Sequence, residues 1–129
     1  MKGTSYDTRF LVELFYSSDR SRQEKIKDVL LRSRPNLLST AALSELYSLT
    51  LQKEGREVAE VRANVLSKDF RLVDVDRGIA IQAAVIKHKH GVPFADSLIA
   101  ATAEVLGVPC YSDDPHLRAI PGLAVKWVD

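Results

Sequence analysis

Hydrophobic positions three and four residues apart divide most of this chain into helical segments, and short apolar runs stand between them. Helices are expected at residues 7–17, 19–34, 42–55, 57–69, 78–91 and 93–107, with a single helical turn at 114–120. Strands are expected at residues 3–6, 36–40, 70–76, 108–112 and 123–128. Strands that alternate with helices predict an α/β fold, here a three-layer α/β/α sandwich around a short-stranded, mainly parallel sheet.

The same spacing predicts which residues share a helical face. Four apolar faces are expected: Phe10, Leu11, Leu14 and Phe15; Ile26, Val29 and Leu30; Ile81, Ala84, Val85 and His88; and Phe94, Leu98, Ile99, Thr102, Val105 and Leu106. Gly107 then ends the last of these helices. The strand at 3–6 is polar in sequence, so we expect it to be short or frayed.

Composition places the chain among ordinary globular proteins. It has 129 residues, of which 46% are hydrophobic and 27% charged, so residues 1–129 are expected to form a single domain. No apolar run approaches the roughly 18 residues of a membrane span, and the N-terminal residues do not resemble a signal peptide. The single cysteine, Cys110, allows no internal disulfide, which predicts a cytoplasmic protein. We expect the Cys110 side chain to be buried. The net charge of +1 argues against a broad duplex-binding surface but leaves room for a local basic groove.

Carboxylates stand where the predicted strands pass into helices. Asp7 follows the first strand, Asp113 and Asp114 follow the strand at 108–112, and Asp96 opens the helix at 93–107. Glu45 lies about one turn into the helix after the second strand. In parallel sheets, ligands bind beyond the carboxyl ends of the strands, so these junctions are the candidate site.

Each acid also has a purely local interpretation. Asp7 is a suitable N-cap, and Asp113 or Asp114 before Pro115 forms a cap followed by proline at the first helical position. Asp96 is stabilised by the helix dipole by about 0.3–1 kcal/mol wherever its side chain points. Glu45 is compatible with a solvent-facing position.

Together the acids favour a metal site. Two like charges 4 Å apart repel by about 4 kcal/mol at an effective dielectric constant near 20, so a cluster of four needs cations. Oxygen ligands without cysteine suit Mg²⁺ or Mn²⁺ better than zinc. One or two such ions on carboxylates are typical of hydrolytic attack at phosphorus. His116 lies close to these acids in the sequence and is a candidate substrate contact.

Residues 90–117, "HGVPFADSLIAATAEVLGVPCYSDDPHL", resemble the C-terminal half of PIN domains, especially small prokaryotic VapC-like ribonuclease toxins. Asp96 and the alanines that follow match the family's acid-headed helix, and the stretch from Ser112 to Asp114 matches its strand end. The Asp7–Thr8 pair and Glu45 match the first two acids of the family in order and spacing. The alignment favours Asp114 over Asp113 as the fourth acid.

The resemblance implies a metal-dependent endoribonuclease that cleaves single-stranded RNA, commonly a toxin with a small antitoxin partner, and a homodimer. Asp7, Glu45, Asp96 and Asp114 would then be the catalytic residues and would hold Mg²⁺ or Mn²⁺. Thr8, Ser112 and Asp113 would support them.

Arg9 stands where the family has a small polar residue, and it is the candidate for binding the RNA backbone.

Two other classes of function are weighed against this interpretation. A PIN-like RNA-binding, RNA-processing or assembly module would bind without metal-dependent turnover, and the complete carboxylate set argues against it. A phosphoacceptor receiver domain also has clustered acids on a parallel sheet. There the acid pair follows the first strand, whereas the pair in this chain, Asp113 and Asp114, comes late.

Overall fold

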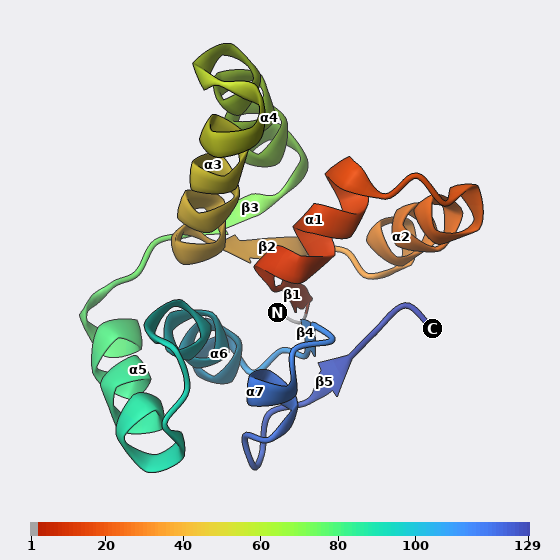
Figure 1. Ribbon diagram of the computed structural model, residues 1–129. Helices are drawn as coiled ribbons and strands as arrows, with labels where there is room; N and C mark the ends of the chain where they lie inside the picture. Colours follow the sequence, from red (N-terminus) through yellow and green to blue (C-terminus); the bar gives the residue numbers. More distant parts are fainter. Residues whose placement is uncertain (1–2) are drawn as a thin grey trace.

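The computed structural model describes residues 3–129 and has a five-stranded sheet in the order β3-β2-β1-β4-β5 (Figure 1). The strands are β1 (Thr4–Tyr6), β2 (Asn36–Ser39), β3 (Arg71–Val73), β4 (Cys110–Tyr111) and β5 (Val125–Lys126). Every neighbouring pair is parallel, with registers such as Ser5 opposite Leu37 and Ser5 opposite Cys110. The predicted α/β class and parallel sheet are confirmed.

Helices connect the strands. They are α1 (Thr8–Tyr16), α2 (Arg20–Arg32), α3 (Thr40–Glu54), α4 (Arg56–Asp69), α5 (Arg77–His90), α6 (Phe94–Leu106) and the single turn α7 (Pro115–Arg118). In Figure 1, α1 to α4 occupy the upper part of the view, and α5, α6 and α7 occupy the lower part. This division follows from the strand order. The chain steps from β1 to β2 to β3 in one direction and then from β4 to β5 in the other, and right-handed crossovers in opposite directions cover opposite faces.

The direction of winding reverses between β1 and β4, which lie side by side at the centre of the sheet. A reversal of this kind leaves a crevice beyond the carboxyl ends of the two strands, because their connections leave on opposite faces. β1 ends at Tyr6 and β4 ends at Tyr111, so Asp7 and Ser112 are the first residues to enter that crevice.

Aromatic rings beneath this crevice form part of the core. The ring of Tyr6 lies 4.5 Å from that of Phe10, 5.6 Å from that of Phe70 and 5.7 Å from that of Tyr111, measured between centroids. Trp127 packs edge-on against Phe10 at 6.3 Å. The strand expected to be short or frayed is short, with three residues, but all three are buried at the centre of the sheet.

The inward faces of α1 and α2 are as predicted, since Phe10, Leu11, Ile26 and Val29 are buried. The face predicted for α5 is wrong. Its buried residues are Ile79, Ala83 and Ile86, whereas Ile81 is 49% exposed and Val85 39% exposed.

In α6, Ile99 and Thr102 are buried as expected. Phe94 and Val105 are exposed instead. This helix contacts both α5 and the sheet, so most of its surface is buried. The small residues at 100, 101 and 103 are among its buried residues. Cys110 is buried, as predicted. None of the helices within residues 3–129 has both the length and the apolarity needed to cross a membrane.

Candidate active site

Asp7 connects the ends of the two central strands. One carboxylate oxygen, Oδ1, accepts a hydrogen bond from the backbone N–H of Thr8 at 2.8 Å and so caps α1. The other, Oδ2, accepts a hydrogen bond from the Ser112 hydroxyl at 2.7 Å. The Asp7 residue is only 2% exposed. The capping role and the position in the crevice therefore coexist, because each uses a different oxygen.

Glu45 reaches the same crevice from α3. Its Oε1 accepts a hydrogen bond from the Thr8 hydroxyl at 2.5 Å, and the residue is half-buried. Glu45 lies in the second turn of α3, whose first residues follow directly from β2. Thr8 therefore links the first two predicted acids, through its backbone N–H to Asp7 and its hydroxyl to Glu45.

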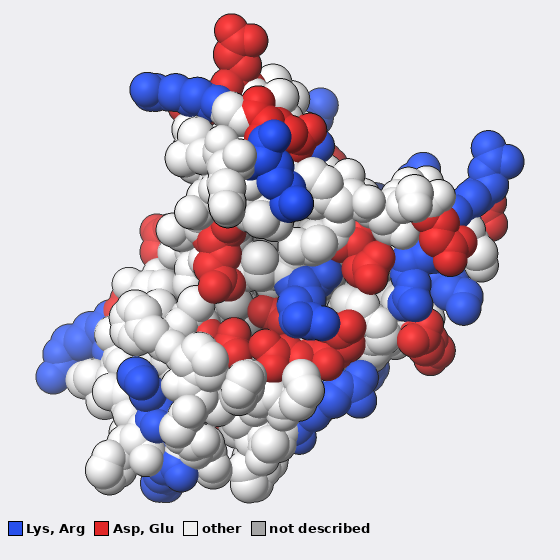
Figure 2. Space-filling view, in the orientation of Figure 1, with Lys and Arg blue, Asp and Glu red and all other residues white. Residues whose placement is uncertain are grey.

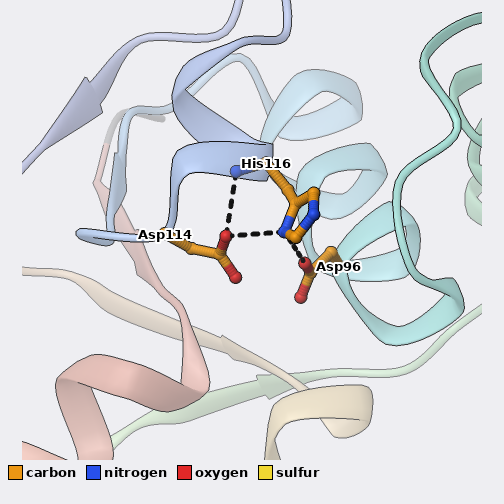
Figure 3. Close-up of side chains that lie close together, drawn as sticks. All are labelled: Asp96, Asp114 and His116. Carbon is orange, nitrogen blue, oxygen red and sulfur yellow. Dashed lines mark hydrogen bonds and ion pairs between the residues drawn. The ribbon is translucent and has the colours of Figure 1, made fainter.

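Asp96 on α6 and Asp114, the residue just before α7, lie close together with His116 beside them (Figure 3). Asp114 caps α7, because its Oδ1 accepts a hydrogen bond from the backbone N–H of His116 at 2.9 Å. The imidazole Nδ1 of His116 lies 2.9 Å from the same oxygen and 3.7 Å from Oδ2 of Asp96. The sequence predicts His116 only as a substrate contact. Its position two residues after Asp114, an acid that caps a helix, is the sequence feature that indicates direct contact with that acid.

The electrostatics of these carboxylates reflect their proximity. Burial, followed by the charges of Asp114 and Glu45, raises the pKa of Asp7 to about 6, against the hydrogen bonds from Ser112 and Thr8. Burial, followed by the charges of Asp114 and Asp7, raises the pKa of Asp96 to about 7. Burial also disfavours the charged form of Asp114, but the hydrogen bonds from His116 hold its pKa below the usual value.

Asp113 points to a different partner. It forms an ion pair with Arg9. The hydrogen bond between the two side chains is the main reason why the pKa of the Arg9 guanidinium is raised. The two side chains are 56% and 34% exposed, so the pair lies at the surface. Figure 2 shows acidic side chains gathered across the middle of this face, with basic side chains next to them.

The donor set fits a divalent cation. Within residues 3–129, Asp96, Asp114 and His116 offer ligand atoms that all lie within 4.8 Å of one another. Asp7 and Glu45 lie outside that group of three but raise the pKa of Asp96 by their charge. Carboxylates held close together with raised pKa values suit a hard cation bound by oxygen, such as Mg²⁺ or Mn²⁺. The structure thus brings together all four predicted acids, with Thr8 and Ser112 bridging them.

The fold and the site together define a class of protein. It is an α/β protein whose acidic residues lie where the strand order of the parallel sheet reverses. The PIN domain family model matches residues 6–123, and the chain therefore belongs to the PIN domain family. The comparison with curated proteins finds no match.

Solved structures share the fold at low sequence identity. DNA-bound VapBC from Salmonella typhimurium has a TM-score of 0.82 at 18% identity, with 100% of both chains covered. A toxin–antitoxin complex from Klebsiella pneumoniae has a TM-score of 0.77 at 20% identity, covering 98% of both chains. VapC20 from Mycobacterium tuberculosis, described as a Sarcin-Ricin loop cleaving toxin, has a TM-score of 0.76 at 24% identity, covering 94% of this chain and 96% of that one. The fold is thus that of the VapC toxins.

Proposed function

We propose that residues 1–129 form a single nuclease domain that cleaves single-stranded RNA in the cytoplasm with the help of Mg²⁺ or Mn²⁺. The observation that carries the proposal is the convergence of Asp7, Glu45, Asp96 and Asp114 on one crevice, where burial and mutual repulsion raise the pKa of Asp7 and Asp96. Membership of the PIN domain family supports it. The description of VapC20 as a Sarcin-Ricin loop cleaving toxin supports the same reaction class.

In this proposal the four carboxylates hold one or two divalent ions. A bound ion would activate water for attack on the phosphodiester and stabilise the leaving oxygen. The Thr8 hydroxyl donates to Glu45 and the Ser112 hydroxyl donates to Asp7, so each hydroxyl fixes the orientation of one ligand. The carboxylates of Asp7 and Asp96 lose their protons when a cation binds, because the cation favours their charged forms.

Arg9 is the proposed contact with the RNA backbone. Its guanidinium lies at the exposed edge of the acidic crevice and is held there by Asp113. A positive charge at this place would attract the phosphate backbone, in addition to the charge of the bound cations. An arginine fork also binds phosphate oxygens in a defined orientation.

Cleavage of a fluorescent single-stranded RNA tests the proposal directly. We expect cleavage with Mg²⁺ or Mn²⁺, no cleavage in EDTA, and none by Asp96→Asn. Asp28→Asn is the matched control, because Asp28 is an exposed aspartate on α2 that forms an ion pair with Arg32 in the adjacent turn. Cleavage that persists in EDTA, or in Asp96→Asn, would contradict the mechanism.

We propose a small antitoxin as protein partner and a homodimer as the assembly. The Salmonella and Klebsiella structures are toxin–antitoxin complexes of the same fold.

Exposed apolar side chains at Ile81, Val85 and Phe94 favour a second copy against α5 and α6, since burying them removes apolar surface from water. Light scattering of the purified chain measures the dimer, and Val85→Glu is expected to shift it to monomer while Glu57→Gln on α4 does not.

An apolar groove favours the antitoxin. The groove has a volume of about 1170 Å³ and includes Leu14, Phe15, Leu31 and Phe70 among its lining residues, with Lys27, Arg34 and Lys68 also contributing to it. Apolar walls with basic residues suit an amphipathic segment with acidic residues.

Co-purification with the product of a small neighbouring reading frame tests this partner. Leu31→Asp is expected to abolish co-purification, and retention by this variant would contradict the assignment of the groove.

A further inference from the structure

His116 is held against the two acids by its own backbone. Asp114 accepts the backbone N–H of His116 at 2.9 Å, and Pro115 occupies the first position of α7 between them. This short turn directs the imidazole back over the carboxylate that caps it, as Figure 3 shows. The ring nitrogen Nδ1 therefore lies in the space between Asp114 and Asp96, while the rest of the ring faces the surface.

The distances match those between ligands of one ion. A divalent cation with bonds of about 2.0–2.2 Å places neighbouring ligand atoms about 3 Å apart and opposite ones somewhat over 4 Å apart. Nδ1 of His116 lies 2.9 Å from Asp114 Oδ1 and 3.7 Å from Asp96 Oδ2, and the three ligand atoms fall within 4.8 Å of one another. This spacing is compatible with one ion among the three side chains.

The chemistry of the third donor distinguishes between cations. Mg²⁺ is bound almost entirely by oxygen, whereas imidazole nitrogen suits transition metals, and affinity rises along the first row from Mn²⁺ onward. Carboxylate oxygens suit both Mg²⁺ and Mn²⁺, so carboxylates alone discriminate weakly between them. A site with one imidazole favours Mn²⁺.

We infer that His116 is a ligand of the bound metal through Nδ1 and makes the site select Mn²⁺ over Mg²⁺. The inference rests on the proposed metal site and adds a residue and a preference to it. As a ligand, His116 would carry its proton on Nε2 and offer the Nδ1 lone pair to the cation, in place of the hydrogen bond that Nδ1 makes with Asp114 when no cation is bound. The backbone contact with Asp114 then serves to place the ring.

Electron paramagnetic resonance of the full chain loaded with Mn²⁺ tests the inference without reference to activity. We expect pulsed spectra to show coupling to a directly bound imidazole nitrogen, and the coupling to change when the histidines are labelled with ¹⁵N. The coupling should be lost in His116→Gln and retained in His90→Ala. His90 is the matched control because it is an exposed histidine in the last turn of α5.

Calorimetry gives a second measurement. In His116→Gln we expect the affinity for Mn²⁺ to fall by roughly 10-fold or more and that for Mg²⁺ to change little, because only the softer cation uses the nitrogen. Equal losses for the two cations would overturn the inference.

The outcomes separate the two proposals. Mn²⁺ that binds, is lost in Asp96→Asn and shows no nitrogen coupling would overturn the role of His116 and leave the nuclease proposal standing. Nitrogen coupling that persists in His116→Gln would also overturn it. A chain that binds neither Mn²⁺ nor Mg²⁺ would contradict the nuclease proposal and this inference together.

Discussion

Two of the charged clusters within residues 3–129 differ in how their charges are balanced. Glu54 at the end of α3 pairs with Arg62 of α4 and accepts a hydrogen bond from the Tyr16 hydroxyl at 2.8 Å. The Arg62 guanidinium also lies 4.6 Å from the centre of the Tyr16 ring and 5.1 Å from that of Phe15. In the crevice, by contrast, four acids lie together, and the nearby arginine, Arg9, forms its ion pair with Asp113, which is not one of the four.

The pKa directions express this difference. The Tyr16 hydrogen bond, with the Arg62 charge, lowers the pKa of Glu54, whereas burial and neighbouring acids raise the pKa of Asp7 and Asp96. A cluster in which opposite charges are paired holds helices together. A cluster of like charges lowers the stability of the fold unless a cation binds to it. Carboxylates with raised pKa values in a crevice therefore indicate a binding site, while an acid with a lowered pKa inside a balanced cluster indicates a structural contact.

Asp7→Asn should have the largest effect, and its two consequences should have opposite signs. RNA cleavage is expected to fall at least about 100-fold, because a metal ligand matters no less than the groups that orient it. The unfolding temperature without metal should rise at pH 8, because asparagine still caps α1 and no longer adds to the repulsion. Cleavage assays and calorimetry measure the two effects. Full activity, or a lower unfolding temperature, would remove the contrast with the Glu54 cluster.

Stability without metal should fall as pH rises from about 4 to about 7. The folded pKa values of Asp7 and Asp96, about 6 and about 7, lie above the ordinary value, so the folded state holds more protons than the unfolded state in this window. Asp7 alone accounts for a loss on the order of 2–3 kcal/mol. Urea unfolding in EDTA across this range measures it, and saturating Mn²⁺ should flatten or reverse the slope. A slope that is the same with and without Mn²⁺ would contradict the prediction.

Arg62→Ala tests the cluster in which opposite charges are paired. We expect the free energy of unfolding to fall by about 1–2 kcal/mol, from the lost contacts with two aromatic rings and the buried part of the side chain. Mn²⁺ affinity should not change, because the crevice residues keep their contacts. Arg56→Ala, an exposed arginine on the same helix, is the control and should stay within about 0.5 kcal/mol of the wild type. A loss of Mn²⁺ affinity in Arg62→Ala would show that the two clusters are coupled.

Arg9→Ala should give the smallest change. We expect KM for RNA to rise about 3- to 10-fold with a smaller change in kcat, and the dependence of binding on salt to weaken by about one ion. Arg20→Ala at the start of α2 is the control, since Arg20 is equally an exposed arginine. An unchanged KM for Arg9→Ala would remove Arg9 from the proposed RNA contact.

The sequence predicts the order of elements well because each element carries its own local signal. It predicts the wrong face for α5 because apolar residues fill most positions from 79 to 86, so helical spacing fits two faces equally. Packing against α6 decides between them, and that contact is not a local property. Ile81 and Val85 are left outside as a result.

The candidate acids could be chosen from the sequence, but their meeting could not be derived from it. Asp7 and Ser112 meet only because β4 pairs with β1, and that pairing depends on the whole strand order. The separate direction of Asp113 toward Arg9 is likewise a matter of side-chain placement. His116 follows its capping acid by two residues, and its approach to Asp96 depends on where α7 packs.

The pairing of β1 with β4 also has a consequence for the order of folding. Asp7 and Ser112 are joined by a hydrogen bond across 105 positions of the chain. Contacts of such long range form late, because closing a long loop costs entropy before the contact contributes any stability. During synthesis, the crevice cannot close until the residues of α7 have left the ribosome. A nascent chain therefore carries its first acid, Asp7, for almost the whole of translation without a complete site.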